Sequence, residues 1–166
     1  MNDPAALSPD PLRFRSVMGT FPTGVAVVTA TGAGGEPVGL TVNSLTSVSL
    51  YPPLILVCID HGSASHDAIV DSGRFGVNLL KDSGRELSDR FATGTREDRF
   101  QDLGWHPGPA GSPLLDDALA WIDCEVYQAH VAGDHTIVVG RVVDCDHTDD
   151  DPLVYHRGRY RKLAGP

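Results

Sequence analysis

Twelve residues from Gly39 to Leu50, GLTVNSLTSVSL, combine the alternation of a β-strand with a polar face that carries no charge. A period of two is typical of a strand with one buried face. The polar side chains are Thr41, Asn43, Ser44, Thr46, Ser47 and Ser49, and the apolar ones are Leu40, Val42, Leu45, Val48 and Leu50. Neutral donors and acceptors at short reach suit a polar, partly anionic small molecule held against a sheet. A hydroxyl-rich edge strand that faces solvent has the same pattern.

Further strand patterns surround this segment. Tyr51-Pro52-Pro53 ends it, because neither proline can donate to a ladder. We expect strands at 24–31, 37–50, 54–59, 74–80, 118–131 and 135–147, and a short one after Leu153. Strands outnumber helices and βαβ alternation is weak. The pattern therefore predicts a mainly β protein, an antiparallel barrel with peripheral helices and no unpaired edges.

Three short helices are expected at the periphery. The first has Asp10 at its N-cap and Pro11 in its first turn. The second runs over 63–73. The third opens at Ser83, where Glu86 completes a capping box.

The 166 residues fit one domain. We expect a flexible tail at 1–10 and a domain from 11 to 166. Within the domain, residues 93–117 are rich in glycine, proline and charge and predict a long surface excursion, and loops of this length are often functional.

The composition disfavours several classes of partner. The formal net charge is −9, whereas nucleic acid and anionic membranes both require clustered positive charge. No apolar run approaches the length of a membrane span, and the first residues lack the pattern of a secretory signal. Three scattered cysteines and seven histidines without ligand spacing predict no metal site. Reduced cysteines indicate a cytoplasmic protein.

The order of several motifs resembles the flavin reductase family. These motifs are FPTGVAVVT from Phe21, GLTVNSLTSVSLYPPLILVCID from Gly39, FGVNLL from Phe75, GDH at 133–135 and PLVYHRG from Pro152. The resemblance extends over nearly the whole chain, and its specificity lies in the order and spacing of the blocks. It implies a split β-barrel that forms a homodimer and binds flavin near the subunit interface.

The resemblance also implies a set of flavin-binding residues. It places the flavin along TVNS and TSVS, beside the end of the next strand, and its phosphate at the loop SASH. These segments contribute Thr41, Val42, Asn43, Ser44, Thr46, Ser47, Val48, Ser49, Cys58, Ile59, Asp60, Ser63, Ser65 and His66. A helix that begins at this loop offers free N–H groups and hydroxyls to an anion, but either serine can instead cap its own helix. Asp60 either accepts a hydrogen bond from the flavin ring or caps a turn.

His135 is the candidate catalytic residue. It follows a Gly-Asp turn and begins a strand, so its ring can project into a cleft. In the family the matching histidine lies on the nicotinamide side of the flavin. The alternative is a histidine that is hydrogen-bonded within its own turn. The other histidines, His61 among them, are expected to be surface or packing residues, with His66 and His156 retained as candidate phosphate neighbours.

Aromatic and cationic side chains complete the candidate site. Tyr155, Arg157 and Tyr160 can stack on an adenine or pair with a dinucleotide phosphate, or form a dimer interface instead. Phe91, on an amphipathic helix, is either a flavin contact or a core residue.

The chain has no glycine fingerprint of a dinucleotide-binding fold, no Walker lysine and no nucleophile elbow. Hydride chemistry would therefore come from cofactors. We expect an NAD(P)H-dependent reductase of free FMN or FAD that uses NADH or NADPH and passes reduced flavin to a transient oxygenase partner. Two rivals remain: a split-barrel oxidase or deazaflavin-dependent reductase, and a flavin-binding storage or sensing module without reductase activity.

Overall fold

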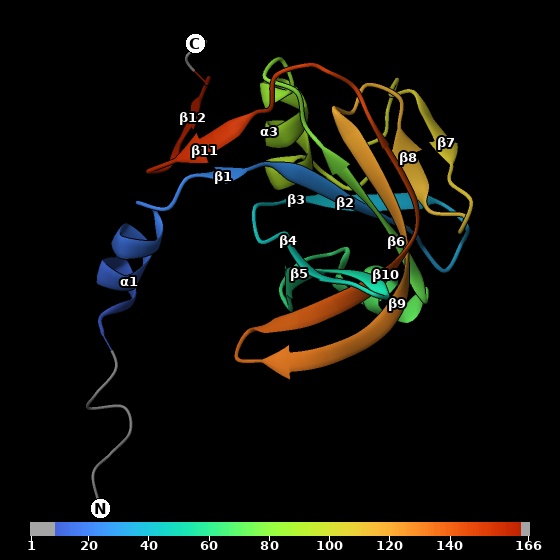
Figure 1. The fold of residues 1–166 in the computed structure, drawn as a ribbon, viewed down its shortest axis with the longest axis horizontal. Helices are drawn as coiled ribbons and strands as arrows, with labels where there is room; N and C mark the ends of the chain where they lie inside the picture. Colours follow the sequence, from blue (N-terminus) through green and yellow to red (C-terminus); the bar gives the residue numbers. More distant parts are fainter. Residues whose placement is uncertain (1–8, 164–166) are drawn as a thin grey trace, which may run out of the picture.

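The computed structural model describes residues 9–163, which form mainly antiparallel strands. Seven strands make up the main sheet in the order β3-β2-β6-β9-β10-β5-β4 (Figure 1). They are β2 (Ala26–Thr31), β3 (Pro37–Val42), β4 (Thr46–Leu50), β5 (Pro53–Asp60), β6 (Arg74–Leu79), β9 (Ala120–Ala132) and β10 (His135–His147). The predicted mainly β, antiparallel class is confirmed.

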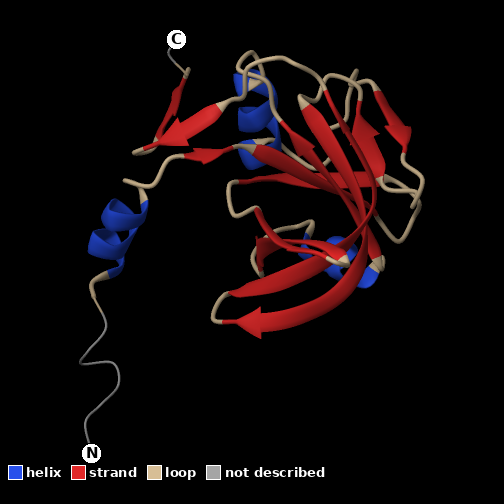
Figure 2. Cartoon of the chain, in the orientation of Figure 1, coloured by secondary structure: helices blue, strands red, loops and turns tan. Residues whose placement is uncertain are grey.

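The predicted single strand over 37–50 is wrong, because the chain breaks at residues 43–45. β3 pairs with β2, whereas β4 pairs with β5, so the two halves of this segment form the opposite edges of one sheet. The sheet curls around a common interior (Figure 2). No ladder joins β3 to β4 within residues 9–163, so the barrel keeps two edges where complete closure was expected.

The hydroxyl of Ser44 forms a bridge from this break in the chain to β5. Extending the β4–β5 register beyond the pair of Thr46 and Leu56 places Ser44 opposite Cys58. There the Ser44 Oγ accepts a hydrogen bond from the Cys58 N–H and donates one to the Cys58 carbonyl, each at 3.0 Å. One side chain thus satisfies both main-chain groups that a longer ladder would pair.

The interior of the curled sheet is packed with side chains. Phe75 from β6, Ile59 from β5 and Val138 from β10 have no exposed surface. Gly140 on β10 lies against the Phe75 ring, and a Cβ at this position would overlap it. A second core cluster surrounds the fully buried Phe91. The barrel interior is therefore a core, and a ligand must bind at its rim.

Two of the helices pack beside the sheet, and both begin later than predicted. α2 (His66–Asp71) is shorter than the predicted helix at both ends, and α3 (Arg85–Thr93) begins after Ser83. The predicted capping box of Ser83 and Glu86 is wrong. A tight turn ending at Gly84 makes this glycine the N-cap, and no side chain caps the helix.

The excursion over residues 93–117 is present but is not wholly irregular. It contains a hairpin of β7 (Trp105–Pro107) and β8 (Pro113–Leu115). Phe100 anchors the excursion by packing edge-on against Phe91, with ring centroids 5.1 Å apart. Strands of three residues are too short to give a periodic pattern in the sequence.

The two ends of the described chain meet in an arm, formed by α1 (Pro11–Met18), β1 (Thr23–Gly24), β11 (Val154–His156) and β12 (Arg159–Arg161). The three strands form a sheet of their own, and α1 projects away from the barrel (Figure 1). The predicted cap of α1 is confirmed, since Asp10 accepts a hydrogen bond from the main chain of Arg13.

Residues 1–8 of the predicted tail and residues 164–166 of the predicted domain lie outside the described residues. Within the described part, none of the helices has the length and apolar character needed to cross a membrane.

The contribution of the Ser44 bridge to the stability of the protein can be measured with a variant. Ser44→Ala leaves the main-chain groups of Cys58 without a partner, which we expect to lower the free energy of unfolding by about 1–3 kcal/mol. Urea denaturation measures this change. Ser47→Ala is the matched control, because Ser47 is exposed on β4 and its hydroxyl bonds no described residue. Equal stabilities of the two variants would contradict the bridge.

Candidate functional site

The break between β3 and β4 opens into three neighbouring cavities of about 660, 310 and 200 Å³. Asn43 lines all three, and the largest cavity lies between the barrel rim and the arm. Eight of the predicted site residues line at least one of them: Thr41, Val42, Asn43, Ser44, Thr46, Tyr155, Arg157 and Tyr160. We call this set of cavities the rim groove.

Most hydroxyls at the rim groove are already engaged by the protein. Thr41 Oγ1 donates to the Ser88 carbonyl at 2.7 Å, and Ser44 bridges to the main chain of β5. The exposed carboxamide of Asn43, in contrast, makes no hydrogen bond to residues 9–163. The amide of Asn43 is therefore a polar group at the rim groove that is free to bind a ligand.

The rim groove also contains a buried polar atom without a partner. The residue Thr23 lines two of the three cavities, while its Oγ1 atom is inaccessible to solvent and makes no hydrogen bond to the described residues. Buried polar groups are rarely left unpaired, so this hydroxyl fits a site that is completed by a polar ligand.

Two arginines give the largest cavity a positive field. Arg15 comes from α1 and Arg157 from the turn after β11, and neither forms an ion pair with the described residues. Arg157 has a φ of 51°, and its N–H donates to the carbonyl of Gly19, which ties this turn to the end of α1. In an acidic protein, two unpaired guanidinium groups mark a place for an anionic ligand.

Tyr160 connects the arm to α3. Its hydroxyl lies 2.9 Å from Ser88 Oγ and donates to Asp89 at 2.8 Å, and its ring packs against Tyr155 with centroids 5.5 Å apart. Burial raises the pKa of the Tyr160 phenol. The arm and the barrel are thus held together beside the smallest cavity.

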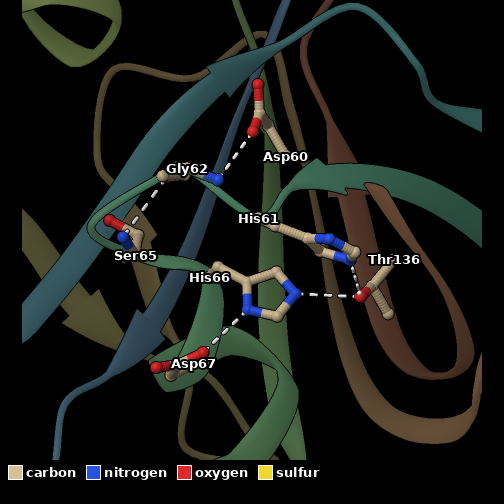
Figure 3. A network of polar contacts seen from close by, with 8 residues as sticks. Asp60, His61, Gly62, Ser65, His66, Asp67 and Thr136 are labelled. Atoms are coloured by element: carbon tan, nitrogen blue, oxygen red, sulfur yellow. Dashed lines mark hydrogen bonds and ion pairs between the residues drawn. The ribbon is translucent and has the colours of Figure 1, made fainter. Parts of the chain in front are cut away.

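The loop after β5 is held by its own side chains (Figure 3). Asp60 accepts a hydrogen bond from the Gly62 N–H at 2.7 Å, which is the turn-capping alternative. Ser63 Oγ accepts from the Ser65 N–H at 3.2 Å, and the buried Ser65 hydroxyl donates to the Gly39 carbonyl at 3.0 Å. The Ser65 hydroxyl therefore links this loop to β3 and is not free in this structure.

His135 lies at the start of β10, opposite Asp60 in the β10–β5 register. Its side chain is 40% exposed, and its Nδ1 lies 2.6 Å from Asp134 Oδ1. This hydrogen bond holds the pKa of the Asp134 carboxyl below its ordinary value. The Nε2 atom of His135 is left for another partner. His135 does not line the rim groove.

The other predicted residues lie away from these cavities. Ile59 and Phe91 are fully buried core residues, so their side chains present no surface to a ligand. Burial raises the pKa of the Cys58 thiol, which keeps it protonated at neutral pH. Of the remaining four, Ser47, Val48 and Ser49 lie on the edge strand β4, where a register shift marks a bulge. His66 begins α2, and its Nε2 lies 2.9 Å from Thr136 Oγ1.

Sequence reasoning did not assign Arg15, Phe21 or Thr23 to the site, although all three line the largest cavity. Phe21 and Thr23 belong to a motif that was used only for the resemblance. Arg15 carries no local signal, because its place in the cavity depends on how the arm docks on the barrel.

Comparison with known proteins identifies the domain. Residues 18–164 match the flavin reductase like domain. A probable flavin reductase of Rhizobium meliloti is 42% identical over 158 residues, which cover 94% of this chain and 50% of that protein. The chain thus spans half the length of this relative.

Solved structures agree with this match. The NADH:FAD oxidoreductase SgcE6 of Streptomyces globisporus, in complex with NAD and FAD fragments, has a TM-score of 0.87 and 35% identity over 99% of this chain and 96% of its own. The styrene monooxygenase flavin reductase SMOB of Pseudomonas putida S12 has a TM-score of 0.84 and 36% identity over 92% of this chain and 98% of its own. The chain belongs to the flavin reductase-like domain family.

The residues of the rim groove fit a flavin. A flavin requires hydrogen-bonding groups for its ring and ribityl chain and positive charge for its phosphate. Asn43 supplies a free carboxamide, Thr23 contributes an unpaired buried hydroxyl beside it, and Arg15 and Arg157 supply positive charge for a nucleotide phosphate. Among the described residues of this flavin reductase-like domain, no group of three or more His, Cys, Asp or Glu side chains is arranged to hold a metal ion.

Asn43→Ala tests the role of the free carboxamide. We expect the Kd for FMN, measured by quenching of flavin fluorescence, to rise about 5- to 20-fold, because one or two ligand hydrogen bonds are lost. Thermal unfolding should stay unchanged, since the side chain bonds no other described residue. An unchanged Kd would show that flavin does not bind at the rim groove.

Proposed function

We propose that this protein reduces free flavin, FMN or FAD, with NADH or NADPH and supplies the reduced flavin to a partner flavin-dependent monooxygenase. The observation that carries the proposal is the rim groove, where a free amide, an orphaned hydroxyl and two unpaired arginines meet at the split edge of the barrel. The family match over residues 18–164 supports the same chemistry. The name of SMOB supports the oxygenase partner.

The nicotinamide supplies a hydride and the flavin accepts it, so the protein itself needs no nucleophile. Its task is to hold the two ligands in register and to limit the access of water. Asn43 binds the flavin from the β3–β4 break, and Arg15 and Arg157 attract the phosphate groups of the nicotinamide dinucleotide. The chain forms no covalent bond to the flavin in this scheme, so reduced flavin can leave for the oxygenase.

His135 is proposed to contact the nicotinamide. Asp134 holds its Nδ1, so Nε2 remains to meet a carboxamide or the negative charge of the reduced flavin. Phosphate contacts are proposed for the loop over 63–66 and stacking contacts for Tyr155. A cytoplasmic location is proposed, and the three free cysteines support it.

The activity is tested by following NADH and NADPH oxidation with riboflavin, FMN or FAD added. We expect turnover that depends on free flavin. His135→Ala should lower kcat about 10- to 100-fold and leave the Kd for oxidised flavin within about threefold, because it removes a contact to the nicotinamide or to the reduced flavin. Bound flavin without any consumption of NADH or NADPH would favour a storage or sensing module instead.

A homodimer is proposed from the arm. Leu12, Phe14, Val17 and Met18 on α1, followed by Phe21, are 52–73% exposed, and no residue of α1 is buried. Phe14, Val17 and Met18 are three and four residues apart on one face of the helix, and exposed apolar surfaces of this kind mark interfaces. A second copy of the chain is the proposed occupant, and because Arg15 and Phe21 line the rim groove, it would cover the flavin site from the side of the arm.

Phe14→Asp places a charge in the middle of this apolar surface, so we expect it to convert a dimer to a monomer. Light scattering coupled to size-exclusion chromatography measures the mass. Val131→Asp is the control, because Val131 is 79% exposed on β9, outside the arm. We expect Val131→Asp to remain a dimer. A wild-type monomer, or a dimer that survives Phe14→Asp, would rule out the arm as the interface.

A further inference from the structure

A buried threonine joins two histidines beneath the loop that follows β5 (Figure 3). Thr136 Oγ1 lies 3.1 Å from His61 Nε2 and 2.9 Å from His66 Nε2. The two imidazole rings are perpendicular, with centroids 5.0 Å apart. Thr136 is only 4% exposed, so water cannot replace its hydroxyl freely. We call these three residues the threonine hub.

The donor and the acceptor of each hydrogen bond in the hub can be assigned. Asp67 is an exposed carboxylate that can only accept, so His66 Nδ1, at 2.8 Å, carries a proton and donates it. In neutral His66 the Nε2 atom is then an acceptor, and Thr136 donates its single proton there. Thr136 Oγ1 can only accept from His61, which must therefore carry its proton on Nε2. One hydroxyl thus selects the tautomers of both histidines.

The hub fixes the loop against the strand that carries His135. Thr136 is the next residue along β10, and the His61 N–H donates to the carbonyl of Asp134 at 3.0 Å. Asp134 in turn holds His135 Nδ1. His61 begins the loop and His66 ends it, so both ends of the segment are bonded to the same side chain.

We propose that Thr136 is a positioning residue, whose hydroxyl holds the loop over 61–66 in the conformation that receives the flavin phosphate. This inference rests on the proposed function and deepens it, because neither the family match nor the predicted site assigns a role to Thr136 or His61. Thr136 touches no ligand itself. Its effect should therefore appear only with flavins that carry a phosphate.

Thr136→Val removes the hydroxyl and keeps a β-branched side chain of the same shape in β10. We expect kcat/KM for FMN to fall about tenfold, as for the loss of one or two hydrogen bonds, and kcat/KM for riboflavin to stay within about twofold. Thr136→Ser retains the hydroxyl and should keep kcat/KM for FMN at the wild-type value. An equal fall in kcat/KM for both flavins would indicate a merely structural role and would overturn the proposal. An unchanged kcat/KM for both flavins would also overturn it.

The imidazole tautomers of His61 and His66 can be measured without an activity assay. Long-range ¹H–¹⁵N spectra should show a proton on Nε2 of His61 and on Nδ1 of His66 in the wild type and in Thr136→Ser, and a mixture of tautomers in Thr136→Val. Rapidly averaged tautomers in the wild type would overturn the hub. If the wild-type protein reduces no flavin at all, the proposed function fails, and these spectra still decide whether Thr136 orders the loop.

Discussion

The split in this barrel depends on the hydrogen bonds of one serine hydroxyl, that of Ser44. Because Ser44 takes the place of a ladder residue opposite Cys58, β5 remains hydrogen-bonded while the chain turns away from it. β3 and β4 can therefore form opposite edges of one sheet although only three residues separate them. The turn leaves Asn43 exposed at the rim, with its carboxamide free. The rim groove is thus a consequence of how the sheet ends.

The arm makes this opening suitable for an anion. The protein is strongly acidic, and a phosphate would be repelled by most of its surface. Arg15 and Arg157 reverse the field locally, and both are held there by the arm: Arg15 on α1, and Arg157 through the main-chain bond to Gly19. The apolar face of α1 remains uncovered in a single chain. Charge for the ligand and apolar surface for a second copy thus come from the same segment.

Much of the fold could be predicted, because long strands give periodic patterns that depend on local sequence. β10 begins and ends as predicted, whereas the break between β3 and β4 was missed. The sequence does contain a signal for it: the alternation slips at Asn43-Ser44, where the chain breaks, and again at Thr46-Ser47, beside the bulge in β4. The resemblance implied a site on this segment, and five of its predicted residues there line the rim groove: Thr41, Val42, Asn43, Ser44 and Thr46. The residues that it missed, such as Thr23 and Thr136, depend on contacts between distant elements, which no local pattern records.

A crystal structure of the protein with FMN tests the central claim most directly. The account predicts that the flavin occupies the break between β3 and β4, with the Asn43 carboxamide and the Thr23 hydroxyl within hydrogen-bonding distance of it. Flavin bound elsewhere, with the rim groove unchanged and Thr23 Oγ1 still unpaired, would contradict it.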